Sequence, residues 1–202
     1  MRTKLAIRGL AALAGLAIAA VGAAGAPAAA ATGTAVTGTA VTVTATKGTH
    51  PAAVRTASLP GAFYAEAINR FSGKCINVAH GSGDNGAWIQ QYHCDRTPAA
   101  KFLFIQNGEG YYEVQNQGSH KCIDIEFGGG WLGARTQQFN CNGSATQQFA
   151  LSELGNGYVK FVNRFSGRCI DVPNYSQADS VVLQLWNCVA GAENQEFRLN
   201  IS

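Results

Sequence analysis

Residues 169–197 read CIDVPNYSQADSVVLQLWNCVAGAENQEF, and the pattern of this segment is the main indication of the fold. Its first four residues alternate between two faces, as they do in a β-strand. The alternation places Ile170 and Val172 on one face and Cys169 and Asp171 on the other. If the aliphatic face is buried in a core, the carboxylate lies on the opposite side.

Residues 182–188 (VLQLWNC) show the same alternation, with Gln184 and Trp186 on the face opposite to the two leucines. If the cysteines of the two segments are bonded, the segments lie side by side. Asp171, Gln184 and Trp186 then emerge together on the side away from the core. A carboxylate accepts from hydroxyls, an amide donates and accepts, and an indole covers the apolar C–H face of a pyranose. The three groups therefore predict a platform for a sugar.

The pattern occurs three times, with a period of 47 residues. Each copy has two cysteines 19 residues apart and ends in a phenylalanine. The third copy has one extra residue before that phenylalanine. We expect the closing phenylalanines and the repeated tyrosines to pack in the core. The landmarks are Cys75, Cys122 and Cys169; Cys94, Cys141 and Cys188; Tyr64, Tyr111 and Tyr158; Asn69, Asn116 and Asn163; Gln90, Gln137 and Gln184; and Phe102, Phe149 and Phe197.

Short alternating segments broken by glycine-rich turns predict strands rather than helices. Examples are GYYEVQN at residues 110–116 and ARTQQFN at residues 134–140. A propeller blade has a similar length, but three blades are too few, since propellers have about four or more. Residues 60–202 are therefore predicted to form one all-β domain of three tandem repeats.

Three motifs carry a family resemblance: Cys-Ile-Asp-Val, Gln-Leu-Trp-Asn-Cys and Asn-Gln-Glu-Phe, all within residues 169–197. Together they resemble the ricin B-type lectin domain with its repeated Q-x-W signature, and the resemblance covers residues 62–202. It implies a β-trefoil, in which three 47-residue repeats of four strands surround a pseudo-threefold axis. The alanine-rich and threonine-rich segments before the repeats are similar to those of secreted actinobacterial proteins.

Six cysteines in an exported domain predict three disulfides. Threefold repetition leaves two symmetric schemes, one within copies and one between neighbouring copies. A zinc site is not expected, because C-x-x-C pairs and matching histidine spacings are missing from the sequence, and neither a metal nor a cofactor is predicted. The lectin resemblance implies the within-copy bonds Cys75–Cys94, Cys122–Cys141 and Cys169–Cys188.

The resemblance also implies one sugar pocket in each copy, and the third copy matches the family pattern throughout. The second copy has Thr146 where the pattern has asparagine. The first copy has Asn77 in place of the aspartate and Ala99 and Ala100 in place of the Asn-Gln pair, so that only Gln90 and Tyr92 remain. The implied binding residues are Asp171, Gln184, Trp186 and Asn194, with Gln195 as support, in the third copy, and Asp124, Gln137, Phe139 and Gln147 in the second.

The three pockets are expected to be unequal. A hydrogen bond to a charged group contributes about 1.5–3 kcal/mol, against roughly 0.5–1.5 kcal/mol for a neutral one. The third pocket is therefore ranked first, the second next, and the first is expected to be silent. In the alternative structural interpretation, Asp171 and Asp124 cap turns, and Gln147 and Gln195 brace the strands from within.

Residues 1–31 are predicted to be a secretory signal peptide. Arg2, Lys4 and Arg8 precede an uncharged apolar run, which ends in an alanine-rich segment with several A-x-A cleavage sites. Residues 32–59 are rich in Thr, Ala, Val and Gly and are predicted to be a linker. We therefore expect an extracellular protein that does not insert into a membrane after cleavage.

The excess of basic residues behind the formal charge of +3 lies in the leader and the linker. From residue 32 onward the chain has 12 basic and 12 acidic residues, and from Pro60 onward it has 10 and 12. This balance argues against a nucleic-acid partner.

Three functional hypotheses follow. The first is a secreted carbohydrate-binding module, for which the family resemblance implies galactose-type or xylan-like glycans. The alternative is a protein-interaction or scaffold trefoil with vestigial sugar sites, and target binding by a Trp186→Ala variant would distinguish the two. An enzyme is not expected, because the repeats offer neither an activated nucleophile nor a paired acid and base. The oligomeric state is left open.

Overall fold

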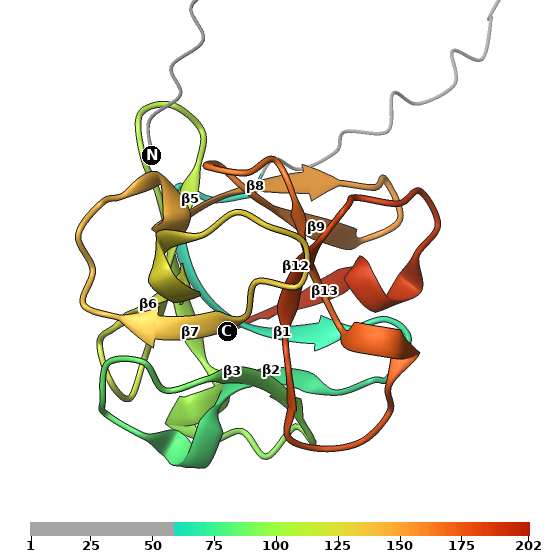
Figure 1. Cartoon of the computed structure of the whole chain (residues 1–202), viewed down its shortest axis with the longest axis horizontal. Helices are drawn as coiled ribbons and strands as arrows, with labels where there is room; N and C mark the ends of the chain where they lie inside the picture. Colours follow the sequence, from blue (N-terminus) through green and yellow to red (C-terminus); the bar gives the residue numbers. More distant parts are fainter. Residues whose placement is uncertain (1–58) are drawn as a thin grey trace, which may run out of the picture. The chain divides into compact units, whose positions relative to one another are not determined.

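The computed structural model describes residues 59–202 (Figure 1). The predicted signal peptide and all but the last residue of the predicted linker lie outside the described residues. Within residues 59–202, no helix is long and apolar enough to cross a membrane.

Six strands form a closed barrel, and each repeat contributes two of them. Their burial alternates along the chain; in the first strand Phe63, Ala65 and Ala67 point inward. The barrel strands are β1 (Ala62–Asn69), β4 (Phe102–Gln106), β5 (Tyr112–Asn116), β8 (Gln148–Glu153), β9 (Tyr158–Asn163) and β13 (Phe197–Ile201).

Antiparallel pairing closes this barrel without a free edge. β1 pairs with β4, β4 with β5, β5 with β8, β8 with β9, β9 with β13, and β13 again with β1. Closure satisfies the backbone groups that an open sheet would leave exposed at its edges. It also brings the first and last strands of the domain together, which ties the third repeat to the first.

Three hairpins cover one end of the barrel, one hairpin from each repeat. Their first strands follow β1, β5 and β9 in the chain, and each pairs antiparallel with the end of that barrel strand. A short additional strand, β11 (Val181–Val182), pairs with the hairpin of the first repeat. The hairpin strands are β2 (Cys75–Val78) with β3 (Ile89–Tyr92), β6 (Cys122–Ile125) with β7 (Thr136–Phe139), and β10 (Cys169–Asp171) with β12 (Gln184–Trp186).

Each repeat has two short 3₁₀ turns at equivalent places. One turn follows the first hairpin strand, and the other precedes the last barrel strand. The first set is η1 (Ala79–Gly81), η3 (Glu126–Gly128) and η5 (Pro173–Tyr175), and the second set is η2 (Pro98–Ala100), η4 (Ala145–Gln147) and η6 (Glu193–Gln195).

The predicted all-β trefoil with pseudo-threefold symmetry is confirmed by this arrangement of three four-stranded repeats. The predicted single strand at residues 182–188 is divided: Leu183 separates β11 from β12, and its backbone N–H donates to Ile89 O of the first repeat (2.9 Å).

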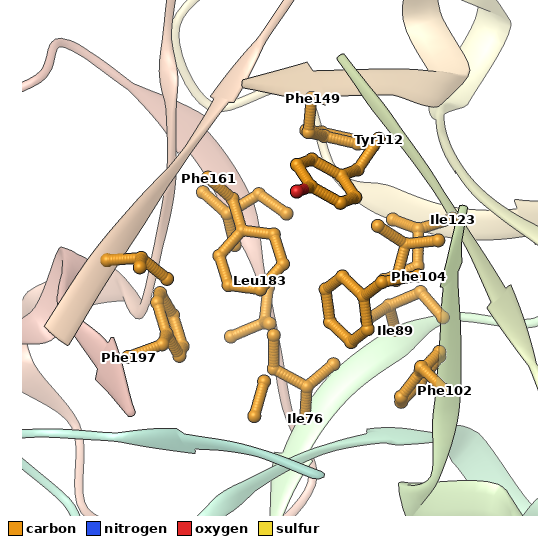
Figure 2. Packing of buried hydrophobic residues seen from close by; sticks show 14 of the residues in the cluster. Ile76, Ile89, Phe102, Phe104, Tyr112, Ile123, Phe149, Phe161, Leu183 and Phe197 are labelled. Atoms are coloured by element: carbon orange, nitrogen blue, oxygen red, sulfur yellow. The ribbon is translucent and has the colours of Figure 1, made fainter. Parts of the chain in front are cut away.

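The core is an apolar cluster inside the barrel and beneath the hairpins (Figure 2). Phe63 and Phe104 stack with ring centroids 4.9 Å apart, and Phe161 meets Phe197 edge-on at 5.4 Å. Burying each such side chain contributes about 1.5–3 kcal/mol. The expectation that Phe102, Phe149 and Phe197 belong to the core is confirmed, because all three are buried.

The expectation for the repeated tyrosines is wrong, because Tyr64 is exposed and Tyr111 and Tyr158 are half-buried at the surface. The curvature of the closed barrel turns the neighbouring positions inward instead. A cation covers each tyrosine ring, which provides a favourable electrostatic contact outside the core. The pairs are Lys101 with Tyr64 (5.7 Å), Arg164 with Tyr111 (4.7 Å) and Arg70 with Tyr158 (5.0 Å).

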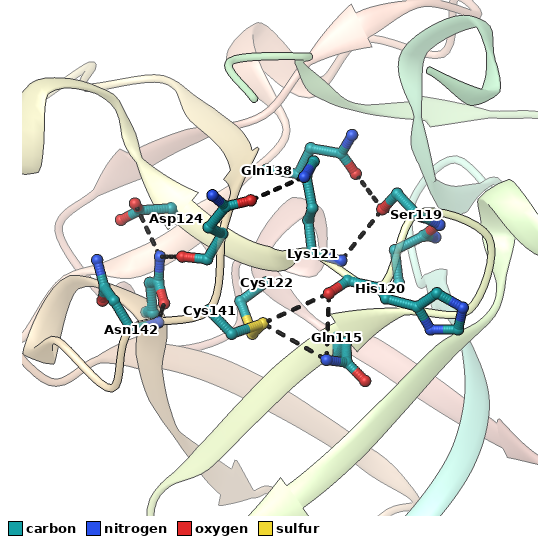
Figure 3. The surroundings of a disulfide bond; sticks show 12 residues. Gln115, Ser119, His120, Lys121, Cys122, Asp124, Gln138, Cys141 and Asn142 are labelled. Carbon is teal, nitrogen blue, oxygen red and sulfur yellow. Dashed lines mark hydrogen bonds between the residues drawn. A yellow bond between two sulfur atoms is a disulfide. The ribbon is translucent and has the colours of Figure 1, made fainter. Parts of the chain in front are cut away.

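All three disulfides lie within single repeats, as the lectin resemblance implied. They join Cys75 to Cys94, Cys122 to Cys141 and Cys169 to Cys188, and none of the six cysteines is free. Figure 3 shows the second of these bonds close to Asp124 and Asn142. Each bond closes the hairpin whose first strand carries the candidate site residue two positions after the first cysteine.

Candidate functional site

The third repeat brings its predicted carboxylate and amide directly together. β10 and β12 pair so that Asp171 lies opposite Gln184, and Ile170 lies opposite Leu185. The two aliphatic side chains are fully buried, as the alternation predicted. Asp171 is on the other face but does not project from it: it is only 4% exposed, at the base of a hollow.

Three amide groups hold the Asp171 carboxylate in place. Gln184 Nε2 donates to Oδ1 at 3.0 Å, while Asn194 Nδ2 and Gln195 Nε2 donate to Oδ2 at 2.8 and 3.0 Å. Burial raises the pKa of Asp171 above its ordinary value, and the three hydrogen bonds oppose this shift. The carboxylate is therefore fixed in one orientation before any ligand arrives.

Gln195 acts behind the pocket as a brace. It is buried, its Nε2 also donates to Asn187 O (2.9 Å), and its Oε1 accepts from the backbone N–H of Val189 (2.9 Å). The buried ammonium of Lys160 donates to Gln195 Oε1 (3.4 Å) and to Val189 O. Desolvation lowers the pKa of Lys160. Gln195 thus connects the carboxylate to the loop after β12.

Asn194 enters the pocket from η6. Its Nδ2 donates to Val172 O (2.9 Å) in addition to Asp171. Its Oδ1 is buried and has no hydrogen-bond partner among residues 59–202. The side chain thus retains unused acceptor capacity beside the carboxylate.

Two aromatic rings stand at the rim of this hollow, which has a volume of about 410 Å³. Trp186 is 41% exposed, consistent with its predicted outward direction. The second ring, Tyr175, was not predicted. It is 48% exposed, and Phe71 of the first repeat supports it edge-on at 5.1 Å.

Tyr175 adopts a left-handed backbone conformation with φ = +51°. The equivalent positions in the first two repeats hold Gly81 and Gly128, which accept such a conformation without strain. A tyrosine at a position that favours glycine was the sequence signal for this residue. Backbone strain of this kind gathers at functional sites.

The second repeat keeps the carboxylate but changes its partners. Asp124 Oδ2 accepts from Gln147 Nε2 (3.1 Å), and Oδ1 accepts from the backbone N–H of Ile125 (2.7 Å). Gln137 lies opposite Asp124 in the strand register, but no hydrogen bond joins the two side chains. The Thr146 hydroxyl is engaged with Ser144 (2.9 Å).

Gln147 has the bracing position that Gln195 has in the third repeat. It is fully buried and also donates to Asn140 O (3.0 Å). Phe139, the predicted ring, stands at the rim and is partly exposed. The second hollow thus joins Asp124, Gln137 and Phe139, with Gln147 behind them.

The first repeat has no carboxylate at the corresponding base. Asn77 stands there, and Gln90 Nε2 donates weakly to its Oδ1 (3.5 Å). Tyr92 and Ala99 line the hollow above them. Only neutral groups occupy the position that Asp171 has in the third repeat.

The repeated asparagines connect each repeat to the pocket of the one before it. Asn69 Nδ2 donates to Asn194 O (3.1 Å), and Asn163 Nδ2 donates to Thr146 O (3.0 Å). Asn116 reaches Ala99 O in the same manner (3.1 Å). The 47-residue period revealed these asparagines, but only the closed barrel shows that each holds the 3₁₀ turn of a neighbouring site.

Comparison with known proteins agrees with this architecture. A model of the ricin-type β-trefoil lectin domain-like family matches residues 58–139, 107–186 and 145–202. The chain belongs to this family. No curated protein matches the sequence.

Among solved structures, the chain is similar to a designed threefold-symmetric protein, ThreeFoil. The two are 33% identical with a TM-score of 0.66, over 67% of this chain and 96% of ThreeFoil. An exo-β-1,3-galactanase from Clostridium thermocellum is 28% identical (TM-score 0.67), over 69% of this chain but only 30% of the enzyme. The Macrolepiota procera ricin B-like lectin in complex with lactose is 16% identical (TM-score 0.59), over 70% of this chain and 96% of the lectin. The last likeness concerns the fold alone.

Membership of a lectin family supports carbohydrate binding in general and a binding module rather than an enzyme. The galactanase shows that such a domain also occurs within a larger glycosidase, of which this chain matches less than a third.

Proposed function

We propose that this protein is a secreted lectin module that recognises galactose-type or xylan-like glycans through shallow pockets, with the third pocket the strongest. The observation that carries the proposal is the Asp171 carboxylate, which three amides orient beneath two exposed aromatic rings. The fixed carboxylate can accept hydrogen bonds from the hydroxyls of a pyranose, and the aromatic rings can cover its apolar C–H face.

In the proposed complex, the Asp171 oxygens accept hydrogen bonds from two sugar hydroxyls. Gln184 and Asn194 exchange hydrogen bonds with the same or neighbouring hydroxyls, and Trp186 or Tyr175 covers the C–H face of the ring. Gln195 contributes by holding Asp171. Because the pocket is shallow and association has an entropic cost, the single-site Kd should be on the order of 0.1–1 mM.

The pocket ranking follows from the groups at each base. The second pocket retains Asp124 but lacks the asparagine, and the first has the neutral Asn77. Polymers that engage two pockets together would bind more tightly than a monosaccharide through avidity.

Export is supported by three disulfides, which persist in oxidising compartments. The signal peptide itself is a sequence-based proposal for residues 1–31.

A glycan array of the mature chain tests the proposal, followed by titration calorimetry of Trp186→Ala against each positive glycan. Binding to a galactoside or a xylo-oligosaccharide that the variant loses would support it. An array without any positive glycan, with a protein target that Trp186→Ala still binds, would favour the interaction-module alternative.

A further inference from the structure

The second hollow is the most aromatic of the three. Phe127, Phe139 and Phe165 all line it, and they are 88%, 38% and 58% exposed. Phe165 comes from the third repeat, so two repeats build this hollow together. Asp124 and Gln137 lie at its base, and its volume is about 620 Å³.

Phe127 combines an unfavourable backbone conformation with an exposed side chain. Its backbone is left-handed, with φ = +53°. The equivalent residues are His80 and Asn174, which belong to the types most often found in that conformation, whereas a bulky phenylalanine is an outlier there. Because its ring is almost wholly exposed, burial contributes little to offset the strain. Strain of this kind is typical of ligand contacts.

The backbone of the loop after η3 lies directly against two aromatic rings, those of Trp131 and Phe165. A Cβ on Gly129 would overlap the Trp131 ring, and one on Gly130 would lie 3.1 Å from the Phe165 ring. The glycines therefore allow aromatic side chains to lie directly on the loop. Arg168 donates to Gly130 O and fixes the loop from the third repeat.

The charge at the base differs from that of the third pocket. Asp171 accepts hydrogen bonds from three side-chain amides. The buried ammonium of Lys160 lies near it and donates to Gln195, one of those three residues. Asp124 accepts only one side-chain amide and one backbone N–H. The position equivalent to Lys160 holds Glu113, which lies within 4.8 Å of the sulfurs of the second disulfide.

No basic side chain neutralises Asp124 within the described part of the chain. None of the ion pairs there includes it, and neither lysine nor arginine lines the hollow. The guanidinium of Arg168 lies against the loop, but it donates to the backbone carbonyl of Gly130 and forms no ion pair with Asp124. The hollow thus combines one uncompensated carboxylate with three exposed aromatic rings.

We propose that the second pocket binds a protonated amino sugar, with its ammonium group held between Asp124 and the faces of Phe127, Phe139 and Phe165. An ammonium ion is attracted to ring faces and to a carboxylate at the same time. Gln137, Asn142 and Ser144 line the hollow and supply polar groups for the sugar hydroxyls. The inference rests on the proposed function, that the pockets of this domain bind glycans, and assigns the second pocket a ligand of its own.

The test uses titration calorimetry of the mature chain with a glucosamine oligosaccharide and its N-acetylated counterpart at pH 6, where the free amine is protonated. We expect the glucosamine oligomer to bind at least about tenfold more tightly, and the preference to weaken at high salt. Phe127→Asn, which installs the residue type of the equivalent Asn174, and Asp124→Asn should each remove most of the preference. Leu154→Asn, an exposed apolar residue outside all three hollows, is the matched control and should retain it.

Equal affinity for the two oligomers, or an unchanged preference in both pocket variants, would overturn the inference. A parallel titration with a galactoside and a xylo-oligosaccharide separates it from the proposed function. If the neutral ligands bind and the amine preference is missing, only the second-pocket assignment fails. If neither the neutral nor the amino sugars bind, the proposed function fails as well.

Discussion

The Asp171→Asn substitution tests the third pocket most directly, because it removes the charge and keeps the size of the side chain. The carboxylate is expected to accept two sugar hydroxyls, and each bond loses about 1–1.5 kcal/mol when its acceptor becomes neutral. The sum of about 2–3 kcal/mol weakens binding roughly 30- to 150-fold. From a Kd of about 0.1–1 mM, the variant should bind too weakly for titration calorimetry to detect.

Asparagine is preferable to alanine at this position. Alanine would remove the acceptor of all three amides, those of Gln184, Asn194 and Gln195, whereas asparagine removes only the Oδ1 acceptor of Gln184. An asparagine oxygen can still accept from the amides of Asn194 and Gln195. The expected loss of about 1 kcal/mol in unfolding free energy corresponds to a Tm decrease of a few degrees.

The matched control is Asn77→Ala in the first repeat, which should leave affinity unchanged, while Asp124→Asn should reduce binding of a neutral glycan only in part. Circular dichroism and a melting curve verify the fold of each variant. If Asp171→Asn is folded and binds within about threefold of the parent, the third pocket is not the sugar site.

Three further predictions use the same assays. Tyr175→Gly should weaken sugar binding about tenfold without lowering Tm, because it removes the ring and relieves the left-handed strain together; a retained affinity would exclude Tyr175 from the site. Affinity should fall on acidification with a midpoint above 3.8, since burial raises the pKa of Asp171 and binding needs the ionised form; a midpoint at or below 3.8 in a pH series of titrations would contradict this. The double variant Cys169→Ser/Cys188→Ser should lose roughly 3 kcal/mol of unfolding free energy, or roughly 10 °C in Tm, and an unchanged melting curve would contradict the estimate.

Much of the fold could be predicted from the sequence because its determinants are local and repeated. Strand alternation alone assigns Ile170 and Leu185 to the buried face and Trp186 to the other. The 47-residue period indicates three equivalent units, and the lectin resemblance provides their arrangement and the disulfide pairing. The opposition of Asp171 and Gln184 follows once the two segments form one hairpin.

Alternation fails where the closed barrel defines what is inside. Phe63 and Tyr64 are adjacent aromatic residues on one strand, so their side chains point to opposite faces. Alternation alone does not tell which of the two rings is buried. Only closure of six strands shows that Phe63 points inward and that Tyr64 meets Lys101 at the surface.

The repeat, the faces of the hairpin strands and the inequality of the three pocket bases could all be predicted from the sequence, because each follows from alternation or from spacing along the chain. The closed fold was needed to place the rims, since Phe71 reaches Tyr175 and Phe165 reaches the hollow of Asp124 from other repeats. It also decided that Asp171 is a buried, braced acceptor rather than a projecting one. Contacts between repeats depend on the closure of the barrel, which brings together residues that no local pattern relates.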